Sequence, residues 1–497
     1  MIIPTQQISH TPAQNPLFAP TTEPFPGEKL PIAIYEDDPS LIELWDIAWR
    51  IAWKHVYTSQ NTPYSPYLGE GCGTNQVWIW DSCFMALWGC YANHIYPVAN
   101  TLDNLYAIIS GKKSGITIHH PDNPPLLGWA ELELYRLTGD RERICKLIAN
   151  KTLQNFYWWR EKVAAPGDYL PWSDSASVML RRLEDGYLWS GCPSGMDNTP
   201  RGRGNYQYLL WVDALAQQGM FAKDIATLCE LADNNAEAKQ FHIEYEAKKS
   251  LMAQYFDAED GCFYDRTLSR PGFGTYIKVL TPASFWPIFA EMSTEEQTKA
   301  MVKTLLDPNK LGGPVACPSV SRDDPDFAPL GAYWRGSVWL PTFYMTMKAL
   351  DKVGEQNLAR TLSLQLIHWM KDCYDQVEPH SIWECYSPTK PMPATTKNEK
   401  YCRKDFCGWS ALGPISLLLE DVIGISVDAP TMTVTWRPPE TKGKCGIRNL
   451  KLGNNTLSLV KHLENYEIST QQPMTLLLGN AKYTLPAGKH LLQVPKG

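Results

Sequence analysis

The sequence predicts a mainly α-helical fold, an (α/α)6 toroid of helical hairpins followed by a small C-terminal β-sheet domain. Between residues 39 and 422, apolar residues recur at helical spacing in pairs of segments joined by short turns. After about residue 425 the pattern changes to the two-residue alternation that is typical of β-strands. Because the helical pairs have no fixed repeat length and their loops are unequal, a closed ring is favoured over an open solenoid.

These patterns divide the chain into three parts. Residues 1–31 contain seven prolines, which lack an amide donor and have a fixed φ, so we expect an extended arm. Residues 32–424 form the helical domain. Residues 425–497 form a small β-sandwich-like domain.

The first predicted helix covers residues 39–57. Asp38 is a suitable N-cap and Pro39 a suitable first helical residue. Trp45, Trp49 and Trp53 follow at four-residue spacing, which assigns them to the core. The same periodicity predicts the remaining helices, with turns at 138–140 and Gly219, over residues 126–137, 141–162, 206–218, 222–232, 234–256, 282–306, 337–351, 354–374 and 409–422.

The C-terminal strands are predicted from alternation and from turn residues. Threonines alternate with Met432, Val434 and Trp436 in the segment 431–436. The segments 474–478 and 483–485 flank Gly479-Asn480, which indicates a hairpin.

Composition and charge exclude several classes of protein. The net charge of −7 argues against nucleic-acid binding, and 44% hydrophobic residues argue against global disorder. The N-terminus has neither a basic region nor an apolar stretch typical of a secretory signal, and no segment is apolar enough to span a membrane. The thirteen cysteines include no CxxC pair, so we expect reduced thiols and a cytoplasmic protein without membrane or nucleic-acid partners.

Tryptophan is unusually abundant, and its distribution suggests a ligand class. The chain has 19 tryptophans, nearly all of them before residue 425. Large aromatic side chains fill cores, but they also form flat walls for sugar rings. The tryptophans that lie in or beside the long loops are Trp78, Trp80, Trp129, Trp172, Trp189, Trp334, Trp339, Trp383 and Trp409.

Two loops each present a candidate catalytic carboxylate. Asp197 lies in the string SGMDNTPRG, where Gly195, Asn198 and Pro200 favour a tight turn. Glu384 lies in WECYSP, between Trp383 and Tyr386. Asp197 also suits an Asx turn, and Glu384 suits a surface position with its stem against the rings. Together, a carboxylate pair in separate loops with tryptophans nearby indicates a site that cleaves a glycosidic bond.

Three further segments carry candidate substrate-binding groups. Asp81 follows Trp78 and Trp80 in QVWIWDSCF, where it suits either a helix cap or a bidentate grip on sugar hydroxyls. Arg335 follows Tyr333 and Trp334 in YWRGSVW, where a guanidinium suits hydroxyl binding or a structural ion pair. The segment DNPPLLGWA contributes Asn123 and Trp129.

With these motifs the chain resembles family 63 of the glycoside hydrolases, within the (α/α)6-barrel α-glycosidases that include trehalases. The resemblance covers motifs between about residues 76 and 415, and SGMDNTPR is its most specific part. It implies that Asp197 is the general acid and Glu384 the general base. The size of the chain is closer to the compact members, which hydrolyse mannosylglycerate and glucosylglycerate.

The resemblance also implies a sugar-binding set of side chains. It assigns Trp80, Asp81, Tyr333, Trp334 and Arg335 to the sugar site. Asn123 stands where the family often has Gln before Pro-Pro, so a shorter amide changes the reach to the substrate. The expected substrate-binding residues are Trp78, Trp80, Asp81, Asn123, Trp129, Trp189, Gly195, Asn198, Tyr333, Trp334, Arg335, Trp383 and Trp409.

The expected reaction is inverting hydrolysis of a small soluble α-glucoside or α-mannoside. Inversion requires a gap of about 6.5–9.5 Å between the carboxyl groups, which leaves room for the attacking water. Two alternatives remain open at this point: a sugar isomerase or epimerase, which would favour histidine as acid and base, and a non-catalytic carbohydrate-binding protein.

No cofactor or metal is expected. Acid, base and water suffice for the reaction. His119, His120 and Asp122 resemble a metal-ligand group, but adjacent histidines on one element should point apart. A small-molecule carbohydrate is the expected partner, and no oligomeric state is predicted.

Overall fold

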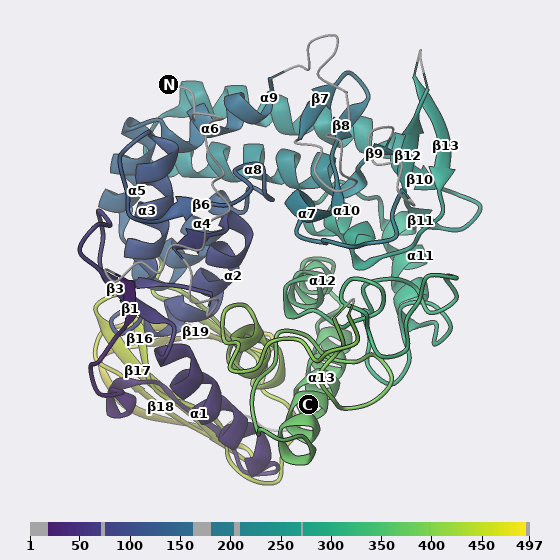
Figure 1. Cartoon of the computed structure of the whole chain (residues 1–497). Helices are drawn as coiled ribbons and strands as arrows, with labels where there is room; N and C mark the ends of the chain where they lie inside the picture. The colour runs from purple at the N-terminus through teal and green to yellow at the C-terminus, as the bar shows by residue number, and fades with distance from the viewer. Residues whose placement is uncertain are drawn as a thin grey trace.

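The computed structural model describes residues 18–70, 75–162, 180–202, 209–269, 272–396 and 398–493. Trp172 and the first seventeen residues of the predicted arm lie outside the described residues. The described chain is mostly helical, with a sheet region formed largely by its C-terminal part (Figure 1).

Six helices follow one another round the centre of the molecule (Figure 1). Each contacts the next, and the last contacts the first. In order along the chain they are α2 (Ile79–Gly89), α4 (Leu127–Thr138), α8 (Val212–Leu231), α10 (Trp286–Phe289), α12 (Leu340–Lys352) and the π-helix η7 (Gly413–Val422).

Outer helices pack against members of this inner series. The contacts pair α3 with α2, α5 with α4, α9 with α8, and α13 with α12, while α1 and α13 both contact η7. The bounds of these and the other long outer helices are α1 (Pro39–Trp53), α3 (Val98–Ile109), α5 (Arg141–Ala149), α6 (Thr152–Arg160), α9 (Asn235–Met252), α11 (Glu295–Leu306) and α13 (Gln356–Gln376).

The helix prediction was correct in type and differs at several boundaries. Helix α1 has the expected Asp38 N-cap, whose side chain accepts from the Ser40 amide at 3.1 Å, but it ends at Trp53 because a strand begins at Val56. The single helix expected over 141–162 is two helices, separated at Lys151 with a φ of 54°. Gly219 is not a turn but lies inside α8, where an added Cβ would lie 2.1 Å from Met292 Cε.

A cycle of aromatic contacts fills the centre of the helical series. Trp80 and Phe84 of α2 have ring centroids 4.8 Å apart, and Phe84 contacts Trp129 of α4 at 5.9 Å. Trp129 contacts Phe289 of α10 at 4.6 Å, and Phe289 contacts Trp286 at 5.8 Å. Trp286 closes the cycle with Trp80 at 6.2 Å.

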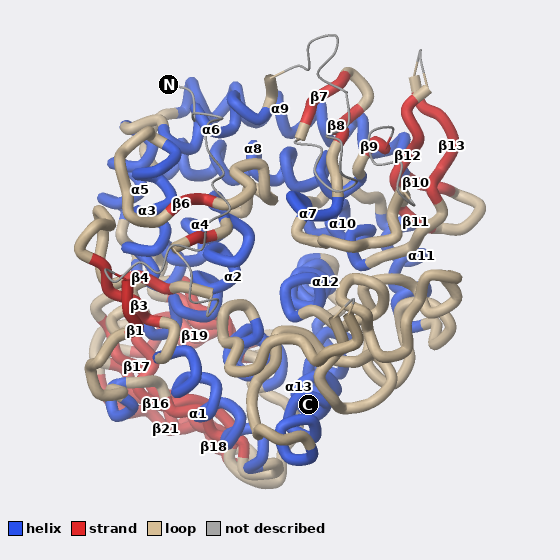
Figure 2. Tube along the Cα trace, viewed as in Figure 1, coloured by secondary structure: helices blue, strands red, loops and turns tan. Residues whose placement is uncertain are grey.

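The C-terminal part contributes to two sheets, gathered beside α1 (Figure 2). In the four-stranded sheet, β15 and β19 are parallel and the other pairs antiparallel; its order is β14 (Ile425–Asp428), β15 (Thr433–Trp436), β19 (Met474–Leu478), β20 (Ala481–Leu485). The five-stranded antiparallel sheet has the order β2 (Ile32–Tyr35), β16 (Cys445–Leu452), β17 (Asn455–His462), β18 (Asn465–Thr470), β21 (Gly488–Gln493).

Strand β2 comes from the start of the predicted helical domain. It pairs with β16, with Ile34 opposite Gly446. Gly446 has a φ of 148°, and an added Cβ there would lie 1.9 Å from the Leu459 carbonyl oxygen, so the close approach of β16 to β17 requires glycine.

The long loops contain short strands that periodicity did not predict. A five-stranded sheet has the order β13 (Phe273–Ile277), β12 (Asp265–Leu268), β9 (Leu209–Leu210), β8 (Gly186–Leu188), β7 (Arg181–Leu183). Smaller sheets join β1 (Phe18–Pro20), β3 (Val56–Ser59) and β4 (Tyr67–Leu68); β5 (Gln76–Val77) and β6 (Thr117–Ile118); and β10 (Phe256–Asp257) and β11 (Cys262–Phe263).

Candidate active site

A cavity of about 140 Å³ brings most of the predicted site residues together. Its size is well below the ~300–1,000 Å³ typical of sites for drug-sized ligands, so it suits a small ligand. The predicted residues that line it are Trp78, Trp80, Asp81, Asn123, Gly195, Asp197, Tyr333, Trp334 and Trp409. Other lining residues are Glu70, His119, His120, Cys192 and Arg403.

The cavity lies at the N-terminal ends of the central helices. Trp78 directly precedes α2, and Asn123 lies shortly before α4. Tyr333 and Trp334 precede α12, and Trp409 precedes the 3-10 turn that leads into η7. The helices therefore act as a rigid frame, and the loops before them supply the chemistry.

Glu384 is buried, with a relative exposure of 1%, and both oxygens of its carboxylate accept hydrogen bonds. Its Oε1 accepts from the Tyr333 hydroxyl at 3.1 Å and pairs with the Arg403 guanidinium at 3.1 Å. Its Oε2 accepts from the Arg403 amide at 3.2 Å. Because all of these partners donate, they favour the ionised carboxylate.

The backbone around Glu384 is fixed as firmly as the side chain. The Glu384 amide donates to the Arg403 carbonyl at 2.9 Å, and the Glu384 carbonyl accepts from the Trp409 indole at 2.9 Å. Trp383 is buried beside it, and its ring contacts Tyr401 at 6.0 Å. Trp383 is not among the residues that line the cavity, so its place is structural support rather than the predicted sugar contact.

Asp197 is held in the cavity wall by a loop with close backbone contacts. Gly195, with a φ of 84°, allows this loop to pass Trp80, whose Cδ2 would lie 3.2 Å from an added Cβ. Gly191 has even less space, because an added Cβ would lie 2.3 Å from the Asp197 carbonyl oxygen. The glycines thus set the position of the acidic residue.

Asn198 joins the Asp197 loop to the Tyr333 loop. Its Nδ2 donates to the Ala332 carbonyl at 3.0 Å, and its Oδ1 accepts from the Trp334 amide at 2.8 Å. Asn198 was predicted as a substrate ligand, but its amide is used in this connection.

Asp81 is a third carboxylate in the same cavity. Burial raises its pKa well above the usual value for aspartate, the Arg403 charge lowers it, and the charges of Asp197 and Glu384 raise it. Burial also raises the pKa of Tyr333, with further contributions from Glu384 and Asp197. Asp81 and Tyr333 both respond to the same two carboxylates, which indicates that all these groups share one electrostatic environment.

Asn123 has lost part of its predicted role to a structural contact. Its Nδ2 donates to the Pro193 carbonyl at 2.7 Å, and its own backbone carbonyl accepts from Arg160 at 2.8 Å. The shorter amide, expected to change the reach to the substrate, therefore fastens the segment that leads to Asp197.

Three more predicted substrate ligands lie away from this cavity. Arg335 pairs with Asp326 at 3.1 Å, which is the structural alternative considered from the sequence. Trp189 is fully buried and its indole donates to Asp122 at 3.1 Å. Trp129 belongs to the central aromatic cycle and lines a different cavity of about 400 Å³.

The expectation that His119 and His120 point apart was wrong. Their ring centroids lie 4.1 Å apart, and both residues line the cavity. His120 has a φ of 50°, which breaks the alternation of an extended strand. Burial lowers the pKa of His120, which favours a neutral ring. Within the described parts of the chain, no three His, Cys, Asp or Glu side chains form a cluster able to hold a metal.

Arg403 is the main residue that the sequence analysis missed. It comes from the loop 398–408, whose charged residues resemble an ordinary solvated loop. Its role depends on backbone hydrogen bonds to Glu384, nineteen residues earlier. No motif in the sequence carries this information.

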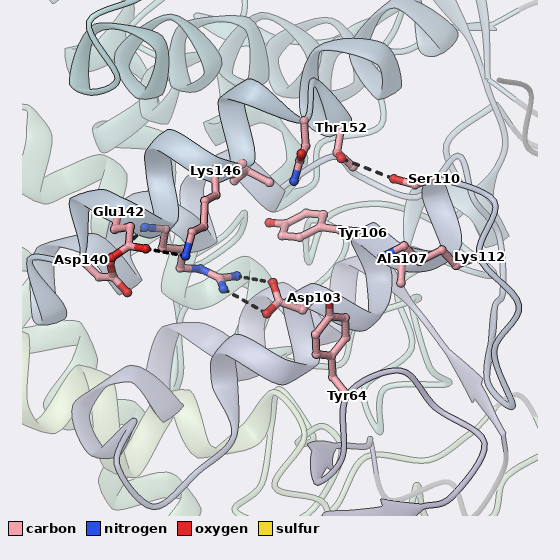
Figure 3. Close-up of a pocket in the computed structure, with 13 residues that line it drawn as sticks. Tyr64, Asp103, Tyr106, Ala107, Ser110, Lys112, Asp140, Glu142, Lys146 and Thr152 are labelled. Atoms are coloured by element: carbon pink, nitrogen blue, oxygen red, sulfur yellow. Dashed lines mark hydrogen bonds and ion pairs between the residues drawn. The ribbon is translucent and has the colours of Figure 1, made fainter.

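A larger cavity, about 640 Å³, lies in the outer layer between α3 and α5 (Figure 3). Its charged groups pair with one another: Arg143 with Asp103 at 2.9 Å, and Lys146 with Glu142 at 2.5 Å. None of the predicted site residues lines it, so size alone does not identify the active site here.

Aromatic walls around clustered carboxylates, on a frame of paired helices, define the site of a glycoside hydrolase. The model of the mannosylglycerate hydrolase MGH1-like glycoside hydrolase domain matches residues 74–401. The chain belongs to this family, as its motifs predicted, and it is an enzyme that hydrolyses glycosides. This assignment does not favour an isomerase or a non-catalytic binding protein.

Individual relatives agree with the family assignment. An uncharacterized protein of Borreliella burgdorferi is 24% identical over 79% of this chain and 81% of its own length. Mannosylglycerate hydrolase MGH1 of Selaginella moellendorffii is 33% identical, over 28% of this chain and 26% of that enzyme. This chain therefore matches only about a quarter of the Selaginella enzyme's length.

A solved structure supports the fold. The GH63 mannosylglycerate hydrolase from Thermus thermophilus, in complex with Tris, has a TM-score of 0.54 at 17% identity. The similarity covers 74% of this chain and 98% of that one. Across the described part of this chain, no helix combines the length and apolar character needed to cross a bilayer.

Proposed function

We propose that the chain is an inverting α-glycoside hydrolase in which Asp197 is the general acid and Glu384 the general base. The observation that carries this proposal is a single cavity. It is lined by Asp197 and by Tyr333 and Arg403, the side chains that hold the Glu384 carboxylate. Separate loops thus direct two carboxylates toward one small space.

The contacts of the two residues support different roles. Glu384 is surrounded by donors and a cation, which is the environment that a base needs to remain ionised. Asp197 is partly exposed in the cavity wall, where a protonated carboxyl group could reach the leaving oxygen. In the proposed reaction Asp197 protonates that oxygen while Glu384 takes a proton from the water that attacks the opposite face.

The proposed substrate is an α-glucoside or α-mannoside with a small aglycone such as glycerate. Trp78, Trp80 and Trp409 offer apolar faces to a sugar ring, and the cavity volume suits one ring. The Thermus thermophilus enzyme is a mannosylglycerate hydrolase, with structures in complex with D-glycerate and with glucose. We also propose that the central and outer helices form the (α/α)6 toroid, with the substrate on its axis.

Substitution of each carboxylate tests the assignment. With α-mannosylglycerate, α-glucosylglycerate and trehalose as substrates, Asp197→Asn and Glu384→Gln should each lower kcat by about 100- to 10,000-fold, because each removes a proton-transfer group. The control is Glu295→Gln, at an exposed ion pair with Lys299 on α11, which should leave kcat unchanged. Activity within about threefold of the wild type in either site variant would reject its role.

A further inference from the structure

We infer that Arg403 is a positioning residue that keeps Glu384 ionised and oriented for its role as the base. This inference rests on the proposed function and adds to it a side chain outside the recognisable motifs. Three contacts link the two residues: the guanidinium–carboxylate pair at 3.1 Å, the Arg403 amide to Oε2 at 3.2 Å, and the Glu384 amide to the Arg403 carbonyl at 2.9 Å.

The need for a cation follows from the crowding of negative charge. Asp81, Asp197 and Glu384 all influence the cavity, and like charges close together favour proton uptake by one of them. Glu384 has almost no access to water, so solvent does little to stabilise its charge. Arg403 lines the same cavity and supplies the opposing charge.

Other titratable groups face Glu384 but do not replace Arg403. Tyr333 donates a hydrogen bond, and burial raises the pKa of its hydroxyl, which keeps it protonated. Cys385 is a buried neighbour whose pKa is raised by burial, with a smaller contribution from Glu384. The remaining titratable side chains around the cavity are Asp81, Asp197, Glu70, His119 and His120.

The chemistry of arginine suits this position. A guanidinium remains charged at all working pH values and is planar, so it can define the orientation of a carboxylate. The Arg403 Cζ lies 5.5 Å from the centroid of the Phe406 ring, which supports the guanidinium from one side. The Arg403 side chain is 48% exposed, so it lies at the border between the buried Glu384 and solvent.

The pH dependence of kcat/KM distinguishes this role from a merely structural one. In Arg403→Gln the acid limb of the profile should move up by about one pH unit or more, because loss of a nearby opposite charge favours the protonated base. The ratio of wild-type to variant kcat/KM should then be at least about tenfold larger at pH 5 than at pH 8. Addition of guanidinium chloride to Arg403→Ala should restore part of the activity lost at pH 5.

Two variants make the result specific. Arg403→Lys keeps the charge without the planar fork, so its acid limb should stay near the wild-type position while kcat falls. Arg141→Gln, at an exposed ion pair with Asp233, is the matched control and should leave the profile unchanged. Thermal unfolding of each variant reports whether the fold is retained.

Specific outcomes would overturn the inference. They are a wild-type to Arg403→Gln ratio that is the same at every pH, no recovery of that variant at high pH, or an acid limb that moves as far in Arg403→Lys. If Glu384→Gln is inactive while Arg403→Gln gives a flat ratio, the inference fails and the proposed function stands. If Glu384→Gln is fully active, both fail.

Discussion

Single side chains connect the loops of the site to one another and to the rest of the chain. Asn198 joins the Asp197 and Tyr333 loops, and Arg403 holds Glu384. His55 follows α1, and its Nε2 lies 2.6 Å from the carbonyl oxygen of Asp405, two residues after Arg403. The end of the first helix is thereby tied to the loop that carries the proposed positioning residue.

His55 should make stability depend on pH. Burial lowers its pKa in the folded chain to about 4, against about 6.5 when unfolded, so the unfolded state takes up the proton first as the pH falls. The stabilisation is complete above about pH 6.5 and is lost as the pH falls toward 4. The shift corresponds to about 3 kcal/mol in the free energy of unfolding.

Denaturant unfolding between pH 7.5 and pH 4.5 checks this expectation. The loss of unfolding free energy over that range should be clearly smaller in His55→Gln than in the wild type. His94→Gln, which replaces an exposed histidine, should behave like the wild type. Equal pH dependence in His55→Gln and the wild type would contradict the role of His55.

At this scale the sequence identified the residues with distinctive motifs and missed those that act through contacts. Asp197, Asp81, Trp78, Trp80, Tyr333 and Trp409 carry recognisable local patterns, and the cavity brings the five others together with Asp197. Arg335 has such a pattern too, yet it pairs with Asp326, while Arg403 has none and lines the cavity. Backbone pairing between distant loops decides between two arginines, and single-sequence patterns do not contain it.

At the scale of elements, close packing between helices decides features that periodicity cannot. Gly128 in the first turn of α4 faces α8, and an added Cβ would lie 2.5 Å from the Asp224 Cβ. Helix α4 can approach α8 this closely only because Gly128 has no side chain. The apolar spacing that predicts α4 and α8 says nothing about the distance between them.

Gly128→Ala should therefore destabilise the protein although alanine has the higher helix propensity. The overlap involves the root of the Asp224 side chain, which cannot rotate away, so we expect a cost of about 1–3 kcal/mol. Chemical denaturation measures it, with Lys239→Ala on the exposed face of α9 as a control that should change stability by less than about 0.5 kcal/mol. An unchanged or higher stability of Gly128→Ala would show that the helices separate freely.

The long helices were predictable because each repeats its apolar spacing over several turns. The sheet of β7, β8, β9, β12 and β13 was not, because its strands are two to five residues long and come from distant segments. Alternation over so few residues is too short to be distinguished from a loop.

At the scale of the whole molecule, segments near the two ends of the chain complete one sheet. Strand β2 pairs with β16, so Ala33 lies opposite Ile447 more than 400 residues later. The sequence indicated both the helical part and the change to strands near residue 425. It could not indicate this pairing, because strand partners are set by tertiary contacts rather than by local alternation.

The same large-scale arrangement produces the site. Loops before four central elements converge on one cavity, and Trp80 belongs both to the wall of that cavity and to the aromatic cycle. The proposed acid and base therefore come from segments that are far apart in sequence and fixed by a common frame. The central claim is that this arrangement performs inverting hydrolysis with Asp197 and Glu384.

Proton NMR of the first-formed product tests that claim most directly. The wild-type enzyme acts on an α-glycoside in the NMR tube, and spectra are recorded before mutarotation equilibrates the released sugar. The account predicts that the β-anomer appears first, and that its formation is lost in both Asp197→Asn and Glu384→Gln. An α-anomer as the first product, or β-anomer release at the wild-type rate by either variant, would contradict it.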